Sequence, residues 1–471
     1  MKTVWMRKTA AAAIVMILMF TIVACNSGNS GNSNTPDPAP AQTGNSQGNT
    51  NQDPAPANDP EPADEAREPV TLRVLWWANT YDPLLEEFTA QYPWITVEPV
   101  TAKYGADAGV GQQLAEEIAA GNPIDLFWHN SLDMVVQDDI AEDLTPYIEQ
   151  DEEFKQFEFV PDFQEQFQVD GKQVGLARGI DALYIFVNKD LLEQYGMEMP
   201  SNDWTYEQLR EMAKKATNPD NKTWGLSNHP FWWTNMMLVY PLANGNAETV
   251  GYMTPDFTRN LADGSNNEVL DDLNFIAEMN LTDGSVLTAK KAQDAGIQGD
   301  GWASGNVLFH YMVAPFIQEY KNTLTFDWDI LPLPRGKAGQ PSFSWITAWY
   351  MSKASKHKEE AWLFLKFWVT NKEFQKKLYD VGATIPTTHD PELQEHFKQL
   401  NVYEGLNTGA LQVAMDNAVF DPTQTMVAGA DFQKAYFPYF GQGANQGLTA
   451  YDYFPPAMQR FNEILAERLA Q

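Results

Sequence analysis

The chain has 471 residues, of which 63 are acidic and 31 are basic, and its formal net charge is -32 at neutral pH. A protein with this much negative charge repels nucleic acid and anionic lipid surfaces, and it is a poor receptor for strongly anionic ligands. We therefore expect no nucleic-acid partner. The sequence contains one cysteine, which excludes an internal disulfide and every site that needs two thiols.

The first 24 residues have the features of an export signal. Basic residues precede an apolar run from Ala10 to Val23, which is too short to remain as a membrane-spanning helix. The run ends in IVAC, and this stretch resembles the lipobox of bacterial lipoproteins, in which the signal is cleaved before the cysteine and its sulfur is acylated. The sequence therefore predicts a signal peptide over residues 1–24 and lipidation of Cys25.

A tether is predicted to follow the lipidated cysteine, over residues 25–69. This segment consists mainly of Gly, Asn, Ser, Pro, Asp and Ala, with almost no residue able to build a core. As a flexible coil of about 40 residues it would reach roughly 35 Å on average, enough to hold a folded body clear of a membrane.

The remaining chain, about 400 residues, is too long for one compact core and predicts two domains. Its first part predicts alternating strands and helices, and such a βαβαβ order gives an open parallel sheet of the α/β class. The predicted elements are a strand at 70–77, a helix that begins at Asp82 and Pro83 and ends before Pro93, a strand at 94–100, a helix that stops at Gly121, and a strand at 124–130.

Aromatic side chains lie at the carboxyl ends of two of these strands, which is the edge where open parallel sheets bind ligands. Trp76 and Trp77 end the first strand, and Trp128 and His129 end the third. Adjacent strand residues face opposite sides, so one of the two neighbouring tryptophans should be buried. Trp76 continues the apolar series of its strand and is the better core residue, which leaves Trp77 for the ligand.

Several later stretches resemble the extracellular solute-binding proteins of bacterial ABC importers, in particular the large family that takes up sugars. The stretch GLARGIDALYIFVNKDLLEQYGMEMPSNDWTYEQLREMAKKAT (175–217) contains an Asn-Lys-Asp strand ending and a Pro-x-x-x-Trp-Thr turn into a helix. Thr205 and Gln208 form a capping box at the start of that helix. Further blocks at 301–311, 328–368 and 382–388 follow in the family's order.

The resemblance implies an α/β fold of two lobes, each a mostly parallel sheet flanked by helices, with a ligand cleft that closes by hinge motion. Lobe 1 would hold residues 70–178 and 346–390, and lobe 2 would hold 182–342 and 395–471. The three crossovers between the lobes would then lie near 178–181, 343–346 and 388–392.

Flat rings at strand ends, in a loop of lobe 2 and at a crossover suit sugars, whose C–H faces stack on aromatic surfaces. Charged residues at the first crossover would either bind sugar hydroxyls or pair with each other as a hinge brace. The candidate ligand-binding residues are Trp76, Trp77, Asn79, Trp128, His129, Arg178, Asp181, Trp232, Trp233, Tyr311, Trp345 and Trp349.

Catalysis is not expected. The sequence contains no HExxH, GxSxG or P-loop motif, and its histidines show no metal-ligand spacing, so we predict neither a metal nor a cofactor. Two alternatives stay open: a glycosidase needs only two suitably spaced carboxylates, and a cationic amine or polyamine would suit an acidic, aromatic cleft on the same fold.

The predicted partners are a small-molecule ligand, expected to be a carbohydrate, and the permease subunits of an ABC transporter. We expect a monomer anchored by its lipid to the outer face of a cell membrane, as in Gram-positive bacteria.

Overall fold

The computed structural model describes residues 67–76, 85–103, 110–129, 131–160, 163–227, 230–299, 301–439 and 447–470, except for the side chains of 182, 230–235 and 398. Cys25, the predicted tether up to residue 66, Trp77 and Asn79 lie outside the described residues.

Three parallel strands and two helices begin the described chain. β1 (Val70–Trp76) pairs in parallel with β2 (Ile95–Thr101) and with β3 (Leu126–His129). α1 (Glu86–Gln91) and α2 (Val110–Ala119) connect them, and Gly121 follows α2 with a φ of 82°. The predicted order of strands and helices is confirmed here, and the helix stop at a glycine has its usual cause, a left-handed backbone that residues with a Cβ avoid.

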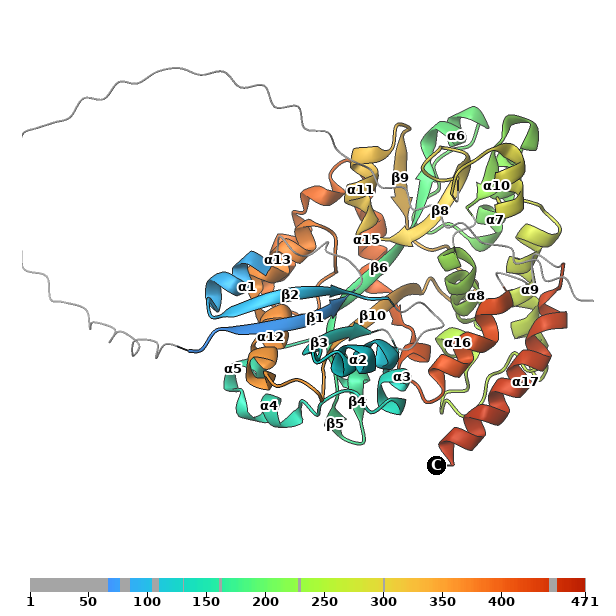
Figure 1. Ribbon diagram of the computed structural model, residues 1–471. Coiled ribbons are helices and arrows are strands. Elements are labelled where there is room, and N and C mark those ends of the chain that lie inside the picture. Colours follow the sequence, from blue (N-terminus) through green and yellow to red (C-terminus); the bar gives the residue numbers. More distant parts are fainter. Residues whose placement is uncertain are drawn as a thin grey trace, which may run out of the picture. The chain divides into compact units, whose positions relative to one another are not determined.

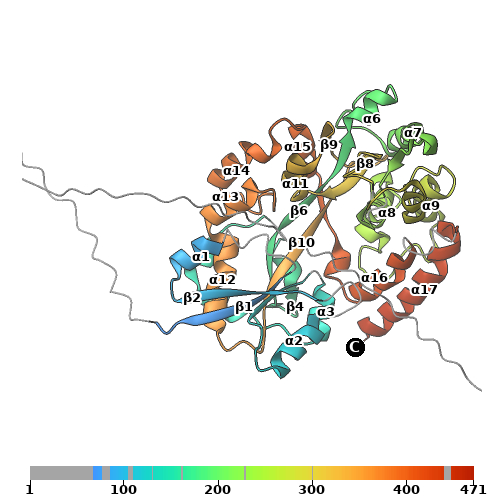
Figure 2. The same ribbon diagram turned by 45° about the horizontal axis from the view of Figure 1, so that its top comes forward.

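Two long strands join this part of the sheet to the rest. β6 (Leu176–Asn188) and β10 (Ser342–Met351) are antiparallel neighbours in the order β2-β1-β3-β10-β6-β8-β7. β10 pairs with β3, and the later half of β6 pairs with β8 (Val307–Val313) and β9 (Trp328–Leu331). Figures 1 and 2 show β6 and β10 between β1–β3 and β8–β9, so these two strands are shared by both lobes of the fold.

Helices cover the sheet on both sides of the shared strands (Figure 2). They are α3 (Leu132–Gln137), α4 (Thr145–Gln150), α5 (Glu152–Lys155), α6 (Lys189–Gln194), α7 (Tyr206–Ala216), α8 (Pro230–Asn244), α9 (Asn267–Leu281), α10 (Ala289–Ala295), α11 (Phe316–Thr323), α12 (Lys358–Thr370), α13 (Lys372–Asp380), α14 (Pro391–Lys398), α15 (Thr408–Asp416), α16 (Gly429–Pro438) and α17 (Ala450–Leu469). The short strands are β4 (Gln168–Val169), β5 (Lys172–Gln173), β7 (Trp224–Leu226) and β11 (Ala418–Phe420).

Side-chain caps fix the starts of two helices, one of which, at Thr205, the sequence predicts. The Asn188 side chain at the end of β6 accepts a hydrogen bond from the Leu191 amide at 3.1 Å and caps α6. The capping box of Thr205 and Gln208 is formed at the start of α7. Each cap satisfies amide donors that a helix leaves without intrahelical partners.

The described residues form two hydrophobic cores. One of them combines residues between Leu72 and Leu176 with residues from β10, α12 and α13. Its centre is aromatic: the Trp349 ring lies 5.7 Å from that of Trp76 and 5.1 Å from that of Trp368. Chain segments far apart in sequence therefore build one lobe, as expected when a chain crosses between lobes more than once. The exact residue limits of the two lobes stay a prediction.

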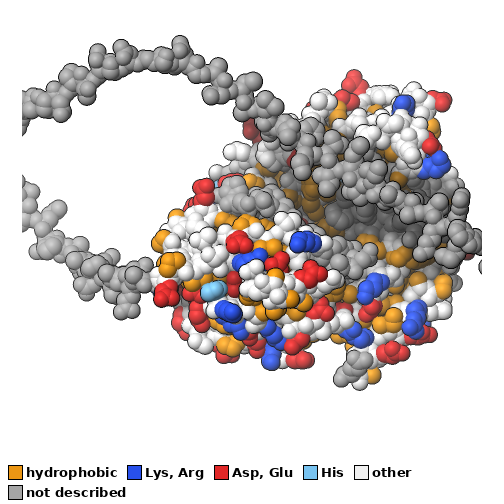
Figure 3. Space-filling model, in the orientation of Figure 1, with side chains coloured by type: hydrophobic (Ala, Val, Ile, Leu, Met, Phe, Trp, Pro, Cys, Tyr) orange, Lys and Arg blue, Asp and Glu red, His pale blue; other side chains and the backbone are white. Residues whose placement is uncertain are grey.

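No helix among the described residues is both long and apolar enough to span a lipid bilayer. Figure 3 shows acidic and basic side chains interspersed over one face of the body.

Candidate functional site

An irregularity in the shared strands sets the geometry of the first crossover. Along β10, Thr347 pairs with Gly179 and the next residue, Ala348, pairs with Ala177, so the ladder skips Arg178. An extra residue of this kind is a β-bulge, which bends the strand and redirects its side chain.

The bulge brings a buried ion pair and an aromatic ring together. Arg178 donates from Nη2 to Asp181 Oδ2 at 3.1 Å, and its guanidinium carbon lies 4.1 Å from the ring centroid of Trp128 on β3. The side chains of Arg178 and Asp181 are 3% and 10% exposed, whereas Trp128 is half-buried. A charged pair thus supports a ring that keeps part of its surface exposed.

Burial dominates the electrostatics of the pair. Removal from water raises the pKa of Asp181, and the charge and hydrogen bond of Arg178 oppose that rise. Of the two possibilities that the sequence left open for these residues, mutual pairing is present in the structure.

His129 is held in a neutral form beside this cluster. Burial lowers the pKa of His129 to about 4, against the opposing effect of its backbone hydrogen bond with Ser131. His129 Nδ1 lies 3.0 Å from the Ser131 amide nitrogen, which can donate to it, and 3.2 Å from the Ser131 carbonyl oxygen, to which a protonated Nδ1 can donate.

Trp345 lies next to the ion pair on the other shared strand. It is half-buried and stands opposite Asp181 in the β6–β10 register. The ring lies 6.1 Å from that of Phe343. The structure therefore gathers Trp128, Arg178, Asp181 and Trp345, all predicted site residues, on three adjacent strands.

A third chain segment meets the first crossover, through a residue that sequence reasoning missed. Thr384 Oγ1 accepts a hydrogen bond from the Ile180 amide at 2.8 Å, and Ile180 forms a bridge with Ile385. A Cβ on Gly179 would lie 2.7 Å from Thr384 Oγ1, so only glycine permits this approach. The glycine in the stretch ARGID was the available signal.

Other predicted site residues lie elsewhere. Trp349 and Tyr311 are fully buried, so their assignment to a ligand surface is wrong. Helices cover β10 at Trp349, and Tyr311 is on β8, which is buried along its whole length. Trp76 is also fully buried, as the strand register predicts for the core member of its pair. Trp232 and Trp233 belong to α8, but their side chains are outside the described part of the structure.

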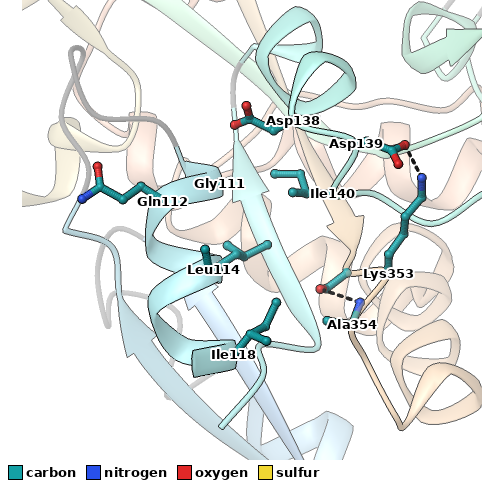
Figure 4. A pocket seen from close by; sticks show the side chains of 11 residues that line it. Gly111, Gln112, Leu114, Ile118, Asp138, Asp139, Ile140, Lys353 and Ala354 are labelled. Carbon is teal, nitrogen blue, oxygen red and sulfur yellow. Dashed lines mark hydrogen bonds and ion pairs between the residues drawn. The ribbon is translucent and has the colours of Figure 1, made fainter. Parts of the chain in front are cut away.

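A pocket of about 350 Å³ is lined by residues other than those of this cluster (Figure 4). Its wall comes from α2, the residues around Asp138 and the end of β10, where Lys353 pairs with Asp139. It contains none of the predicted site residues. Among the described residues, no group of three or more histidine, cysteine and acidic side chains is placed to hold a metal ion.

Comparison with known proteins decides the family. The profile of the bacterial extracellular solute-binding proteins matches residues 77–373, more than half of the chain. The chain belongs to this family. This solute-binding protein is 25% identical over 303 residues to the arabinooligosaccharide-binding protein of Bacillus subtilis, covering 62% of this chain and 66% of that protein.

Solved structures of other binding proteins share the two-lobed fold. An ABC substrate-binding protein of Listeria monocytogenes in complex with cycloalternan superposes with a TM-score of 0.71 at 21% identity, covering 86% of this solute-binding protein and 100% of that chain. The GacH receptor of Streptomyces glaucescens, known in unliganded form and in complex with acarbose, gives a TM-score of 0.66 at 16% identity, covering 85% and 98%. At these identities the likeness establishes the fold.

Proposed function

We propose that this solute-binding protein is a membrane-tethered receptor for a sugar or oligosaccharide, which it delivers to the permease of an ABC transporter. The observation that carries the proposal is the half-buried Trp128 ring, held against the buried Arg178–Asp181 pair on the strands that the lobes share. Such a ring offers a rigid stacking face at the place where a hinged pair of lobes meets its ligand.

The relatives support a carbohydrate as the ligand class. Their names and complexes include arabinooligosaccharide, cycloalternan and acarbose. Oligosaccharides need both flat apolar surfaces and hydrogen-bonding groups, and Trp128 with Trp345 supplies the first requirement.

The arrangement of charges disfavours a cationic amine. Asp181 is the acidic residue at the shared strands that an amine would require, and its carboxylate already pairs with Arg178 at 3.1 Å. A buried carboxylate so neutralised attracts a second cation weakly. We therefore place amine binding second.

We also propose that the protein binds its ligand without chemical change. A receptor should return each oligosaccharide intact after incubation, with a raised melting temperature, because a ligand at 100 times its dissociation constant adds about 2.7 kcal/mol of stability. Hydrolysis of a stabilising oligosaccharide would replace this proposal with the glycosidase alternative.

Titration calorimetry with the stabilising oligosaccharide tests the role of the ring. Trp128→Ala should weaken binding about tenfold, equivalent to about 1.4 kcal/mol of lost stacking. Trp94→Ala is a matched control, because Trp94 is also half-buried and has a guanidinium, that of Arg67, 4.5 Å from its centroid. Equal effects of the two substitutions would refute a specific role for Trp128.

Tethering through Cys25 is a separate part of the proposal, supported by the IVAC stretch and the composition of the following segment. Cys25→Ser should move the folded protein from the membrane fraction to the soluble fraction. A cleaved, folded variant that stays with the membrane would refute lipid anchoring.

The salt dependence of binding tests the class of ligand. Binding that collapses in moderate salt would favour a cationic amine over a neutral sugar.

A further inference from the structure

Asp133, at the start of α3, makes contacts that reach across the molecule. Its Oδ1 accepts a hydrogen bond from Arg468 Nη2 at 2.9 Å, and its Oδ2 accepts from the Ala430 amide at 3.4 Å. Gln137, one turn further along α3, donates to the same Oδ2 at 2.7 Å. Arg468 is close to the end of α17, and Ala430 is in the first turn of α16.

The two sides of this contact are fixed to different parts of the sheet. The segment after α3 is bound to the end of β10: the Lys353 amide donates to the Ile140 carbonyl at 3.0 Å and the Glu142 amide to that of Met351 at 2.8 Å. These hydrogen bonds fix α3 to the part of the sheet that contains β1, β2 and β3.

α17 is fixed on the other side. Asn462 donates from Nδ2 to the Asn260 carbonyl at 3.1 Å and to Asp263 at 2.9 Å, and the Ala450 amide donates to Asn274 on α9 at 3.3 Å. α9 packs on α8, and α8 on β8. Asp133 therefore joins elements that lie on opposite sides of the shared strands.

The start of α16 lacks a cap of its own. Its N-cap residue is Ala428, whose side chain cannot accept a hydrogen bond. The Asp133 carboxylate accepts from an amide of the first turn instead, which also places a negative charge at the positive end of the helix. One carboxylate, 5% exposed, thus both pairs with Arg468 and caps α16.

We propose that Asp133 is an interlobe latch, which stabilises the arrangement of lobes in Figure 1 and must release Arg468 and α16 when the hinge opens. The latch contains no residue of the proposed ligand site, so its effect does not depend on which ligand the protein binds. A contact made in only one of two conformations shifts the equilibrium between them by its own free energy.

Distances between spin labels on the two lobes test the latch. Cys25→Ser leaves the full chain without cysteine. Cysteines introduced at the exposed residues Glu116, on α2, and Glu211, on α7, then provide one label on each side. Pulsed dipolar spectroscopy of the ligand-free protein gives the populations of short and long distances.

Arg468→Gln should increase the ratio of long to short distances about fivefold, because a charged hydrogen bond is lost but its partly exposed position reduces its strength. Asp133→Asn should change the ratio of long to short distances in the same direction. The double variant should show no more than the larger single effect, since both substitutions break one interaction. High salt should raise the long-distance population of the parent and change the variants little.

Arg460→Gln is the matched control, because Arg460 is on the same helix but pairs at 2.8 Å with Glu463, within α17. Unchanged distances in Arg468→Gln, equal changes in Arg460→Gln, or additive effects in the double variant would each overturn the latch. Should Asp133→Asn fail to fold, Arg468→Gln decides the question, because its side chain is 25% exposed and its loss leaves no cavity in the core.

Discussion

Replacing Arg178 by methionine isolates the energetic role of the ion pair at the crossover. The substitution keeps an unbranched apolar side chain near Trp128 but leaves the Asp181 carboxylate without its cation. Because the side chains of Arg178 and Asp181 are only 3% and 10% exposed, water can solvate the unpaired carboxylate little. Removing one member of so buried a pair should lower the unfolding free energy by about 3–5 kcal/mol at neutral pH.

The loss should depend on pH with a definite sign. Burial raises the pKa of Asp181 in the folded protein, and Arg178 opposes that rise, so Arg178→Met should raise the pKa further. Above the folded pKa the carboxylate is charged in both states and the full loss applies. As the pH falls through the folded pKa towards the ordinary value, the folded state takes up the proton first, so the variant recovers stability.

Urea unfolding, followed by tryptophan fluorescence between pH 8 and pH 5, measures both effects. Arg178→Met combined with Asp181→Asn should recover much of the loss, because no charge is then left unpaired. A loss below about 1 kcal/mol, far under the range for a buried pair, would refute the reasoning. A loss that neither changes with pH nor responds to Asp181→Asn would assign the effect to packing instead.

Four further substitutions have definite expected results. The pKa of His129 is about 4 in the folded protein, so the wild-type protein should lose up to about 3 kcal/mol of stability as the pH falls from 6.5 to 4. His129→Asn, which keeps an acceptor near the position of Nδ1, should remove this loss. Unfolding curves of the two proteins, compared over that pH range, measure the difference. Gly179→Ala should cost about 1–3 kcal/mol in urea unfolding, because its Cβ would press on Thr384, and a neutral effect would contradict the close approach. Trp76→Ala should cost about 3–5 kcal/mol with ligand affinity retained, whereas Trp77→Ala should weaken binding and leave melting nearly unchanged; the reverse result would exchange their roles.

Local patterns predicted the elements of the fold well. The βαβαβ order at the start of the body and the capping box at Thr205 depend on side chains within a few residues of each other. Such interactions are encoded locally, so the sequence reveals them.

Burial along the shared strands could not be predicted in the same way. Trp345 and Trp349 are both on β10, yet the first is half-buried and the second fully buried, 5.6 Å from the Phe364 ring of α12. What covers a given length of strand is decided by helices from distant parts of the chain. Composition and spacing therefore identified a set of aromatic residues but, apart from Trp76, could not divide it between core and cleft.

The bulge at Arg178 explains why the ion pair was only one of two open possibilities. In a regular strand, residues three apart face opposite sides, so Arg178 and Asp181 could not meet. The β10 ladder skips Arg178, which changes the alternation by one residue and brings the two side chains within 3.1 Å. Just beyond the bulge, Gly179 admits Thr384 from the third segment. The same short stretch, ARGID, thus redirects a cation towards Trp128 and holds three chain segments together, which makes the proposed site and the proposed hinge parts of one structure.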